Sequence, residues 1–159
     1  MRQSVVLKAT GLVAGSVLAL NLHAQEIQRV PAPNDFPIAS SVTIPAGTQL
    51  HYLSGTVPSK DSEGNYGDTE AQTVSVLKNI EANLKSMGLT MSDVVKMQVY
   101  LVADPAKDGK MDFEGFMKGY TQFFGTKEQP NLPARSAMQV AGLVLPEWLV
   151  EIEVVAASK

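Results

Sequence analysis

Two stretches near the C-terminus decide the fold: Pro133-Ala134-Arg135-Ser136-Ala137-Met138-Gln139-Val140 and Val150-Glu151-Ile152-Glu153-Val154-Val155-Ala156. In both, polar and apolar residues alternate, which is the two-residue period of a strand that turns one face toward a core. A short connection, residues 141–149, separates them. We therefore predict strands over 135–140 and 150–156, with Arg135 on the first and Glu151 on the second.

The segments before these strands predict two helices and three further strands. Apolar residues recur every three or four positions between Asp68, a suitable helix cap, and Gly88, a suitable helix end. Residues 112–124 present a broad apolar face typical of a second helix. The turn Pro45-Ala46-Gly47 favours a hairpin between the first two of the strands expected at 42–44, 49–53 and 94–102. This order predicts an α+β domain, a mixed sheet with both helices on one face.

The first 24 residues have the layout of a secretory signal peptide. Arg2 and Lys8 precede an acid-free apolar run that ends at Leu22-His23-Ala24, with a small residue at the expected cleavage point. The apolar stretch 11–22 is shorter than the ~20 residues that a membrane span needs. We expect a signal peptide over 1–24, a periplasmic or secreted mature protein, and no stable membrane association after cleavage.

The 159-residue chain has room for one domain. Residues 25–35 carry two prolines and few apolar side chains, so we expect an extended leader there and the domain over 36–159.

Composition limits the chemistry that the domain can perform. Removing residues 1–24 would take the formal net charge from −3 to about −5, so nucleic acid is not an expected partner. The chain has no Cys, and His51 would be the single His of the mature protein. Thiolate catalysis is therefore excluded and a multi-His metal site is not expected. We predict a site made of carboxylates, Arg, Lys, hydroxyls and backbone groups, without metal or organic cofactor.

The motif around Arg135, followed by Glu151, resembles the signature of the RidA/YjgF family of imine and enamine deaminases, also called the endoribonuclease L-PSP family. Ser54-Gly55 resembles the glycine turn of that family, and Tyr120 resembles part of its second-helix aromatic motif. The resemblance covers nearly the whole mature chain. It implies a chorismate-mutase-like fold and a homotrimer whose ligand clefts lie between subunits, combining Arg135 of one subunit with second-helix residues of a neighbour.

The resemblance also implies the reaction, the cofactor-free hydrolysis of small 2-imino or enamine acids to 2-keto acids and ammonia. Arg135 and Glu151 would be catalytic: the planar guanidinium can hold a substrate carboxylate through two hydrogen bonds, and the carboxylate can hold the attacking water. Ser54, Gly55 and Tyr120 would complete the substrate-binding surface with Arg135.

Three positions depart from the family pattern. Ile38 stands where the deaminases carry Tyr, Met117 where they carry Asn, and Ala137 where some members carry Cys. The first two changes remove hydrogen-bonding groups. They favour one alternative to an enzyme, a non-catalytic periplasmic binder of small carboxylates in the same cleft. A holdase-like protective protein is a further alternative, with which the acidic composition and the many Met residues are compatible.

We predict that cleavage follows Ala24 and that the mature chain begins at Gln25, because export signals end at small residues. N-terminal sequencing of protein from the periplasmic fraction will check this. Intact Met1 protein held in the membrane fraction would contradict it.

Overall fold

The computed structural model describes residues 26–158. The predicted signal peptide therefore lies outside the described residues. Within them, no helix combines the length and the apolar character that a membrane span requires. The strands and α-helices are β1 (Gln28–Pro31), β2 (Ala39–Thr43), β3 (Gln49–Thr56), α1 (Thr69–Ser86), β4 (Val94–Val102), α2 (Phe113–Tyr120), β5 (Ala134–Val140) and β6 (Val150–Ser158).

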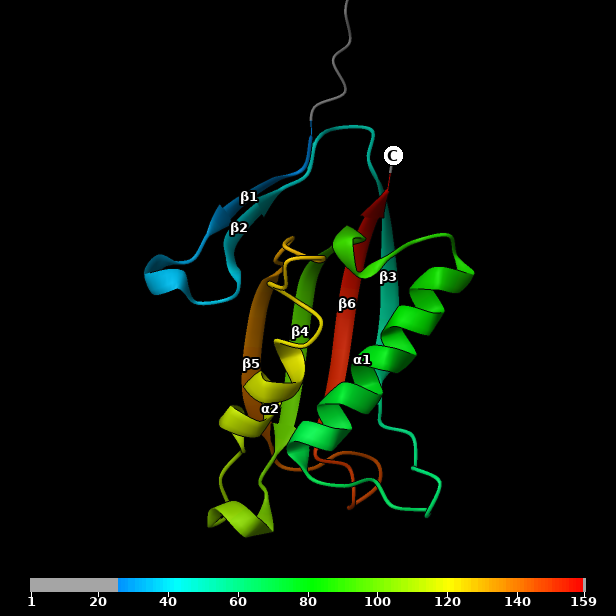
Figure 1. Ribbon diagram of the computed structural model, residues 1–159, viewed down its shortest axis with the longest axis vertical. Coiled ribbons are helices and arrows are strands. Elements are labelled where there is room, and N and C mark those ends of the chain that lie inside the picture. Colours follow the sequence, from blue (N-terminus) through cyan, green and yellow to red (C-terminus); the bar gives the residue numbers. More distant parts are fainter. Residues whose placement is uncertain (1–25, 159) are drawn as a thin grey trace, which may run out of the picture.

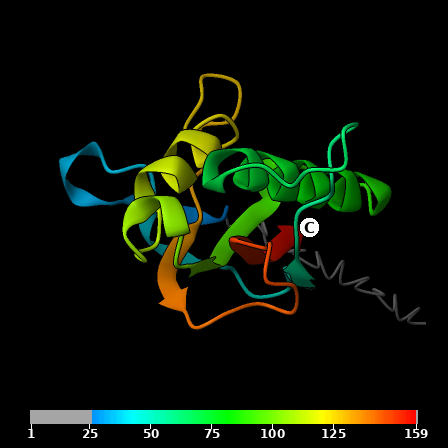
Figure 2. The same ribbon diagram turned by 90° about the horizontal axis from the view of Figure 1, so that it is seen from below.

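The strands form one mixed sheet in the order β1-β2-β5-β4-β6-β3. Strand β4 lies at its centre, parallel to β5 and antiparallel to β6. Both α-helices lie on one face of this sheet (Figures 1 and 2). The predicted α+β architecture is therefore confirmed, with a sheet covered by helices on one side.

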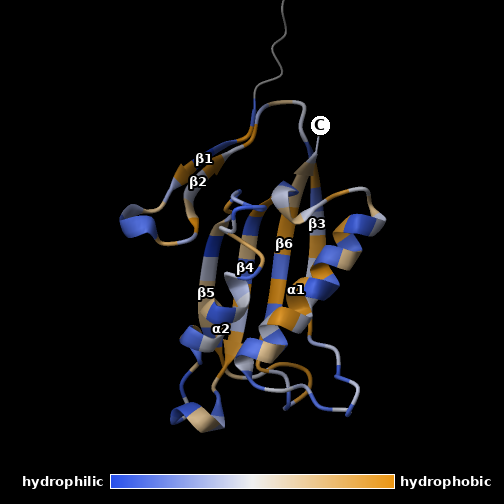
Figure 3. Cartoon of the chain, in the orientation of Figure 1, coloured by the Kyte–Doolittle hydropathy of each residue, from blue (hydrophilic) through white to orange (hydrophobic). Residues whose placement is uncertain are grey.

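The core lies between the helices and the sheet. Figure 3 shows apolar and polar bands alternating along β6, as its sequence predicts. Residues Val150, Ile152 and Val154 are buried against the helices, while Glu151 and Glu153 point to the other face. The burial of large side chains on one sheet face supplies the main driving force for folding.

Helix α1 begins where the sequence predicts, because the Asp68 carboxylate accepts a hydrogen bond from the Ala71 N–H at 2.9 Å. Of the apolar repeat expected on this helix, Leu77, Ile80 and Leu84 are buried. Met87, by contrast, is 43% exposed, and Thr73 is fully buried. Thr73 is accommodated because its hydroxyl donates to the Thr69 carbonyl at 2.7 Å. It also lies where α2 crosses, so a small polar residue occupies a position that the apolar period does not predict.

Helix α2 ends at Tyr120 rather than at the predicted residue 124. It packs closely on α1 at Gly119, where a Cβ would lie 2.7 Å from Thr73 Cβ. The aromatic side chains that the sequence places on this helix and just after it form a continuous row, with Phe116 to Tyr120 and Tyr120 to Phe124 ring centroids 5.8 and 5.0 Å apart. This row covers the β5 side of the sheet.

Two local predictions are wrong. The segment expected to be only an extended leader contains β1, which pairs with β2 to form an arm that projects from one end of the sheet (Figure 1). The turn at Pro45-Ala46-Gly47 does form, but it does not join a hairpin: β2 pairs with β1 and β5, while β3 pairs with β6 at the opposite edge. Turn residues determine where a chain bends, but the pairing of the strands on either side depends on the packing of the whole sheet.

We predict that Gly119→Ala lowers the free energy of unfolding by about 1–2 kcal/mol, because the added methyl group overpacks the contact with Thr73. Gly142→Ala is the matched control, since nothing lies within 4 Å of a Cβ built there. It should stay within about 0.5 kcal/mol of the parent. Urea unfolding measures both changes, and a Gly119→Ala protein as stable as the parent would contradict this helix packing.

Candidate functional site

Arg135 lies on the helix-covered face of the sheet. It is opposite Met97 in the register of β4 and β5, and the Met97 side chain is fully buried on that face. Its guanidinium carbon lies 4.3 Å from the Tyr120 ring centroid and 4.9 Å from that of Phe116. The rings of Phe36 and Phe113 lie at 5.6 and 5.9 Å. We call Phe36, Phe113, Phe116, Met117 and Tyr120 the anchor cage.

The guanidinium has donors that the protein does not saturate. Its Nη2 donates to the thioether sulfur of Met117 at 3.2 Å, a weak acceptor. Its Nη1 is buried without a hydrogen-bond partner, and no ion pair with Arg135 is found within residues 26–158. Burial lowers the pKa of Arg135, although the group remains a cation at physiological pH. A buried cation with free donors is a fitting receptor for a carboxylate.

Tyr120 fixes the arm against the helix. Its hydroxyl donates to the Pro37 carbonyl at 2.9 Å, and its ring stacks under the guanidinium. Burial raises the pKa of Tyr120 to about 12, while the positive Arg135 acts in the opposite direction. The hydroxyl therefore stays neutral and engaged with the backbone, so Tyr120 positions Phe36 and Pro37 beside Arg135. A direct hydrogen bond from Tyr120 to a substrate stays a prediction.

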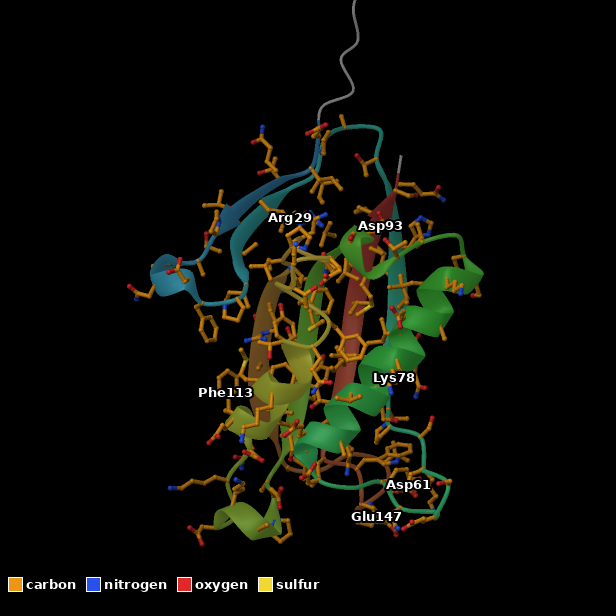
Figure 4. All side chains as sticks on the ribbon, viewed as in Figure 1. Arg29, Asp61, Lys78, Asp93, Phe113 and Glu147 are labelled. Atoms are coloured by element: carbon orange, nitrogen blue, oxygen red, sulfur yellow. The ribbon has the colours of Figure 1, made fainter. Side chains whose placement is uncertain are left out.

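Phe36 and Phe113 enclose the guanidinium from two different elements. Phe36 precedes β2, and Phe113 begins α2 on the side of that helix next to β5 (Figure 4). The sequence gives no direct signal for either contact, because Phe113 and Phe116 fit an ordinary core stripe and Phe36 marks only the expected start of the domain. Their spatial relation to Arg135 depends on how the arm and α2 pack.

Glu151 and Gly55 form a second group. A Cβ at Gly55 would fall on the Glu151 carboxylate, 2.9 Å from its Cδ. The register of β3 against β6 is broken between Leu53 and Thr56, which leaves Ser54 and Gly55 in a bulge beside that carboxylate. A side chain at position 55 would displace the Glu151 carboxylate from its place against this backbone, so glycine lets the two approach closely.

Polar neighbours that the sequence does not single out surround Glu151. It lies opposite Tyr100 in the register of β4 and β6. The Tyr100 hydroxyl donates to the Glu153 carboxylate at 3.2 Å, and burial together with that carboxylate raises the pKa of Tyr100. Glu151 itself has no hydrogen bond from another side chain in the described part of the chain. Its carboxylate is thus the acidic group of this strand left available to a water or a ligand.

Within one chain, the two groups lie apart. Arg135 faces the helices, whereas Glu151 faces the bare side of the sheet. The two residues are also two strands apart across the sheet and about three residues apart along it, which gives roughly 14 Å between their Cα atoms. Strands β5 and β6 are consecutive in sequence, but β4 lies between them. Arg135 and Glu151 cannot contact one small ligand within a single chain.

The cage residues from the second helix belong to the same chain as Arg135. Met117 and Tyr120 contact Arg135 directly, so the expectation that a neighbouring subunit supplies the second-helix residues is wrong. The physical reason is local: α2 packs over β5 of its own sheet. Across residues 26–158, no group of three or more His, Asp or Glu side chains is placed to hold a metal ion.

The chain is similar in sequence to known proteins. The chain is 36% identical over 111 residues to a RutC family protein of Haemophilus influenzae, covering 69% of this chain and 80% of the relative. It is 38% identical over 112 residues to a putative regulator AldR of Lactococcus lactis, covering 69% and 80%.

Solved structures of this family also match the fold of this chain. The Rid family protein YyfB of Yersinia pestis matches with a TM-score of 0.64 and 26% identity, over 84% of this chain and all of the other. E. coli TdcF, solved with bound serine, matches with a TM-score of 0.58 and 28% identity, over 85% of this chain and 99% of that one. The family model for endoribonuclease L-PSP matches residues 37–158. With Arg135 and Glu151 on strands of that chorismate-mutase-like fold, the chain belongs to the RidA/YjgF family.

Proposed function

We propose that the protein hydrolyses small 2-imino or enamine acids to 2-keto acids and ammonia in an exported setting, without a cofactor. Membership of the family supports a role in small-molecule deamination or a related reaction. The observation that carries the proposal is the buried Arg135 guanidinium, whose Nη1 lacks a protein acceptor. The acidic composition of the chain argues against nucleic acid as its ligand.

The proposed reaction needs two functions from the protein. Arg135 holds the substrate carboxylate and so fixes the position of the imine carbon. Glu151 orients a water and accepts its proton as the oxygen attacks that carbon. An enamine first tautomerises to the imine; Glu151 then passes the two water protons in turn to the nitrogen, the first as the carbinolamine forms and the second, taken from its hydroxyl, as the C–N bond breaks, which releases ammonia and leaves the C=O of the keto acid. Backbone groups at Ser54 and Gly55 adjoin the same water position because that strand passes against the Glu151 carboxylate.

The proposed site needs more than one subunit, because Arg135 and Glu151 lie too far apart within one chain to share a ligand. A ring of three copies contains heterologous contacts, in which one surface of a subunit meets a different surface of the next. Such a contact can bring Arg135 of one chain to Glu151 of its neighbour. The bare sheet face also exposes two large apolar side chains that a subunit contact could bury, since Tyr52 is 78% exposed and Met138 is 45% exposed on it. We therefore infer a homotrimer with the site shared between subunits.

A non-catalytic binder is the second candidate, and the contact of Met117 with Arg135 favours it. The Met117 thioether accepts a hydrogen bond from Arg135 Nη2, at the position where the family's deaminases have the amide of an Asn. The anchor alone is sufficient for carboxylate binding. The purified mature protein should be mixed with enamine freshly released from serine by a dehydratase: accelerated keto-acid formation indicates the enzyme, and an unchanged rate indicates the binder.

The carboxylate anchor is tested by Arg135→Lys, which keeps the positive charge but loses the planar fork of the guanidinium. One charge-assisted hydrogen bond contributes about 1.5–3 kcal/mol, so binding of pyruvate should weaken roughly ten- to a hundredfold. Calorimetry on the assembled protein measures this. The matched control is Arg29→Lys (Figure 4), because Arg29 lies outside the anchor cage and its Nη2 donates to the Ser92 and Val94 carbonyls. Unchanged pyruvate affinity in Arg135→Lys would make Arg135 a structural residue.

The shared site is tested by mixing two impaired variants at a substrate concentration too low to saturate Arg135→Lys. Glu151→Gln should retain pyruvate binding but lose turnover, because the amide cannot accept a proton from water. Trimers assembled from equal amounts of Arg135→Lys and Glu151→Gln chains should recover about a quarter of the parental rate, since one contact in four then joins an intact Arg135 to an intact Glu151. Light scattering should report about three chains per particle. A monomer, or mixed particles with no recovered activity, would contradict the shared site.

A further inference from the structure

The accessible surface beside the Arg135 guanidinium is apolar. Phe116 and Tyr120 are fully buried and form its floor. Phe36 is 40% exposed, and the Met117 and Phe113 side chains are half-buried. These three are therefore the cage side chains that a ligand at the guanidinium could contact.

The cage offers a polar substituent little to bind. The one cage hydroxyl, that of Tyr120, is already donated to the Pro37 carbonyl at 2.9 Å. The Met117 sulfur is directed at Arg135 Nη2 and is a weak acceptor in any case. A substrate hydroxyl or amide placed against this surface would lose its hydrogen bonds to water without replacement, whereas an apolar group gains from the transfer.

From these contacts we infer that the site selects carboxylates with a bulky apolar substituent, and that Phe36 and Met117 set this preference. The inference rests on the proposed role of Arg135 as the carboxylate anchor and adds the class of substrate: 2-imino acids with branched or aromatic side chains. The carboxylate binds the guanidinium, and the substituent lies against the accessible faces of Phe36 and Met117. Phe36 reaches this position because Tyr120 holds the adjoining Pro37.

Product analogues test the preference without requiring turnover. Pyruvate and 4-methyl-2-oxopentanoate share the carboxylate and the keto group and differ by three carbons of branched alkyl chain. Each buried methylene strengthens binding by roughly fourfold, so partial burial of the alkyl chain predicts at least about tenfold tighter binding of the larger acid. Calorimetry on the assembled mature protein gives both dissociation constants.

The ratio of the two constants is the informative quantity in the variants. Phe36→Ala and Met117→Asn should each bring this ratio down several-fold, even where loss of a contact with Arg135 weakens both ligands together. Val30→Ala is the matched control, because Val30 is 52% exposed on β1 of the same arm, outside the anchor cage. It should keep the parental ratio.

The outcomes separate this inference from the proposed function. If both acids bind the parent with equal affinity, Arg135 remains an anchor and the apolar preference is wrong. If the larger acid binds more tightly but neither variant changes the ratio, Phe36 and Met117 do not set the preference. If Arg135→Lys binds pyruvate as tightly as the parent, Arg135 is not the carboxylate anchor, and the inferred substrate class is wrong as well.

Discussion

The burial of one cation, the Arg135 guanidinium, is the constraint on which the rest of this site depends. Taking a guanidinium out of water is costly, and no carboxylate within residues 26–158 compensates it. Its stabilisation comes instead from the faces of four aromatic rings and a thioether. This arrangement holds the fork in place while leaving Nη1 free for an anion.

The same contacts connect the site to the architecture. Tyr120 lies in α2 under the guanidinium and also holds the Pro37 carbonyl, so the helix, β5 and the arm meet at one place. Gly119, one residue earlier, lets α2 approach α1 closely. The position of the anchor therefore depends on helix packing, and a change far from Arg135 can alter its donors.

The second half of the proposed site follows a different principle. Gly55 and Glu151 are brought together by a break in the register of two strands, on the face of the sheet that no described helix covers. Because that face is bare and Arg135 is on the other, the proposed catalysis by the pair would require a second copy of the chain. The oligomer would then be a condition of activity rather than an accessory to stability.

Sequence alone determined most of the elements and the family. The alternation over 94–102 predicted β4 to the residue, Asp68 marked the start of α1, and the motif at Arg135 and Glu151 identified the family. These are local properties, set by a period, a cap or a short motif. Tertiary structure decided what those local signals cannot contain: that β4 separates β5 from β6, that β2 and β3 lie at opposite parts of the sheet, and that Phe36 reaches Arg135. The reason is that strand partners and aromatic contacts depend on which buried surfaces fit together across long separations in the chain.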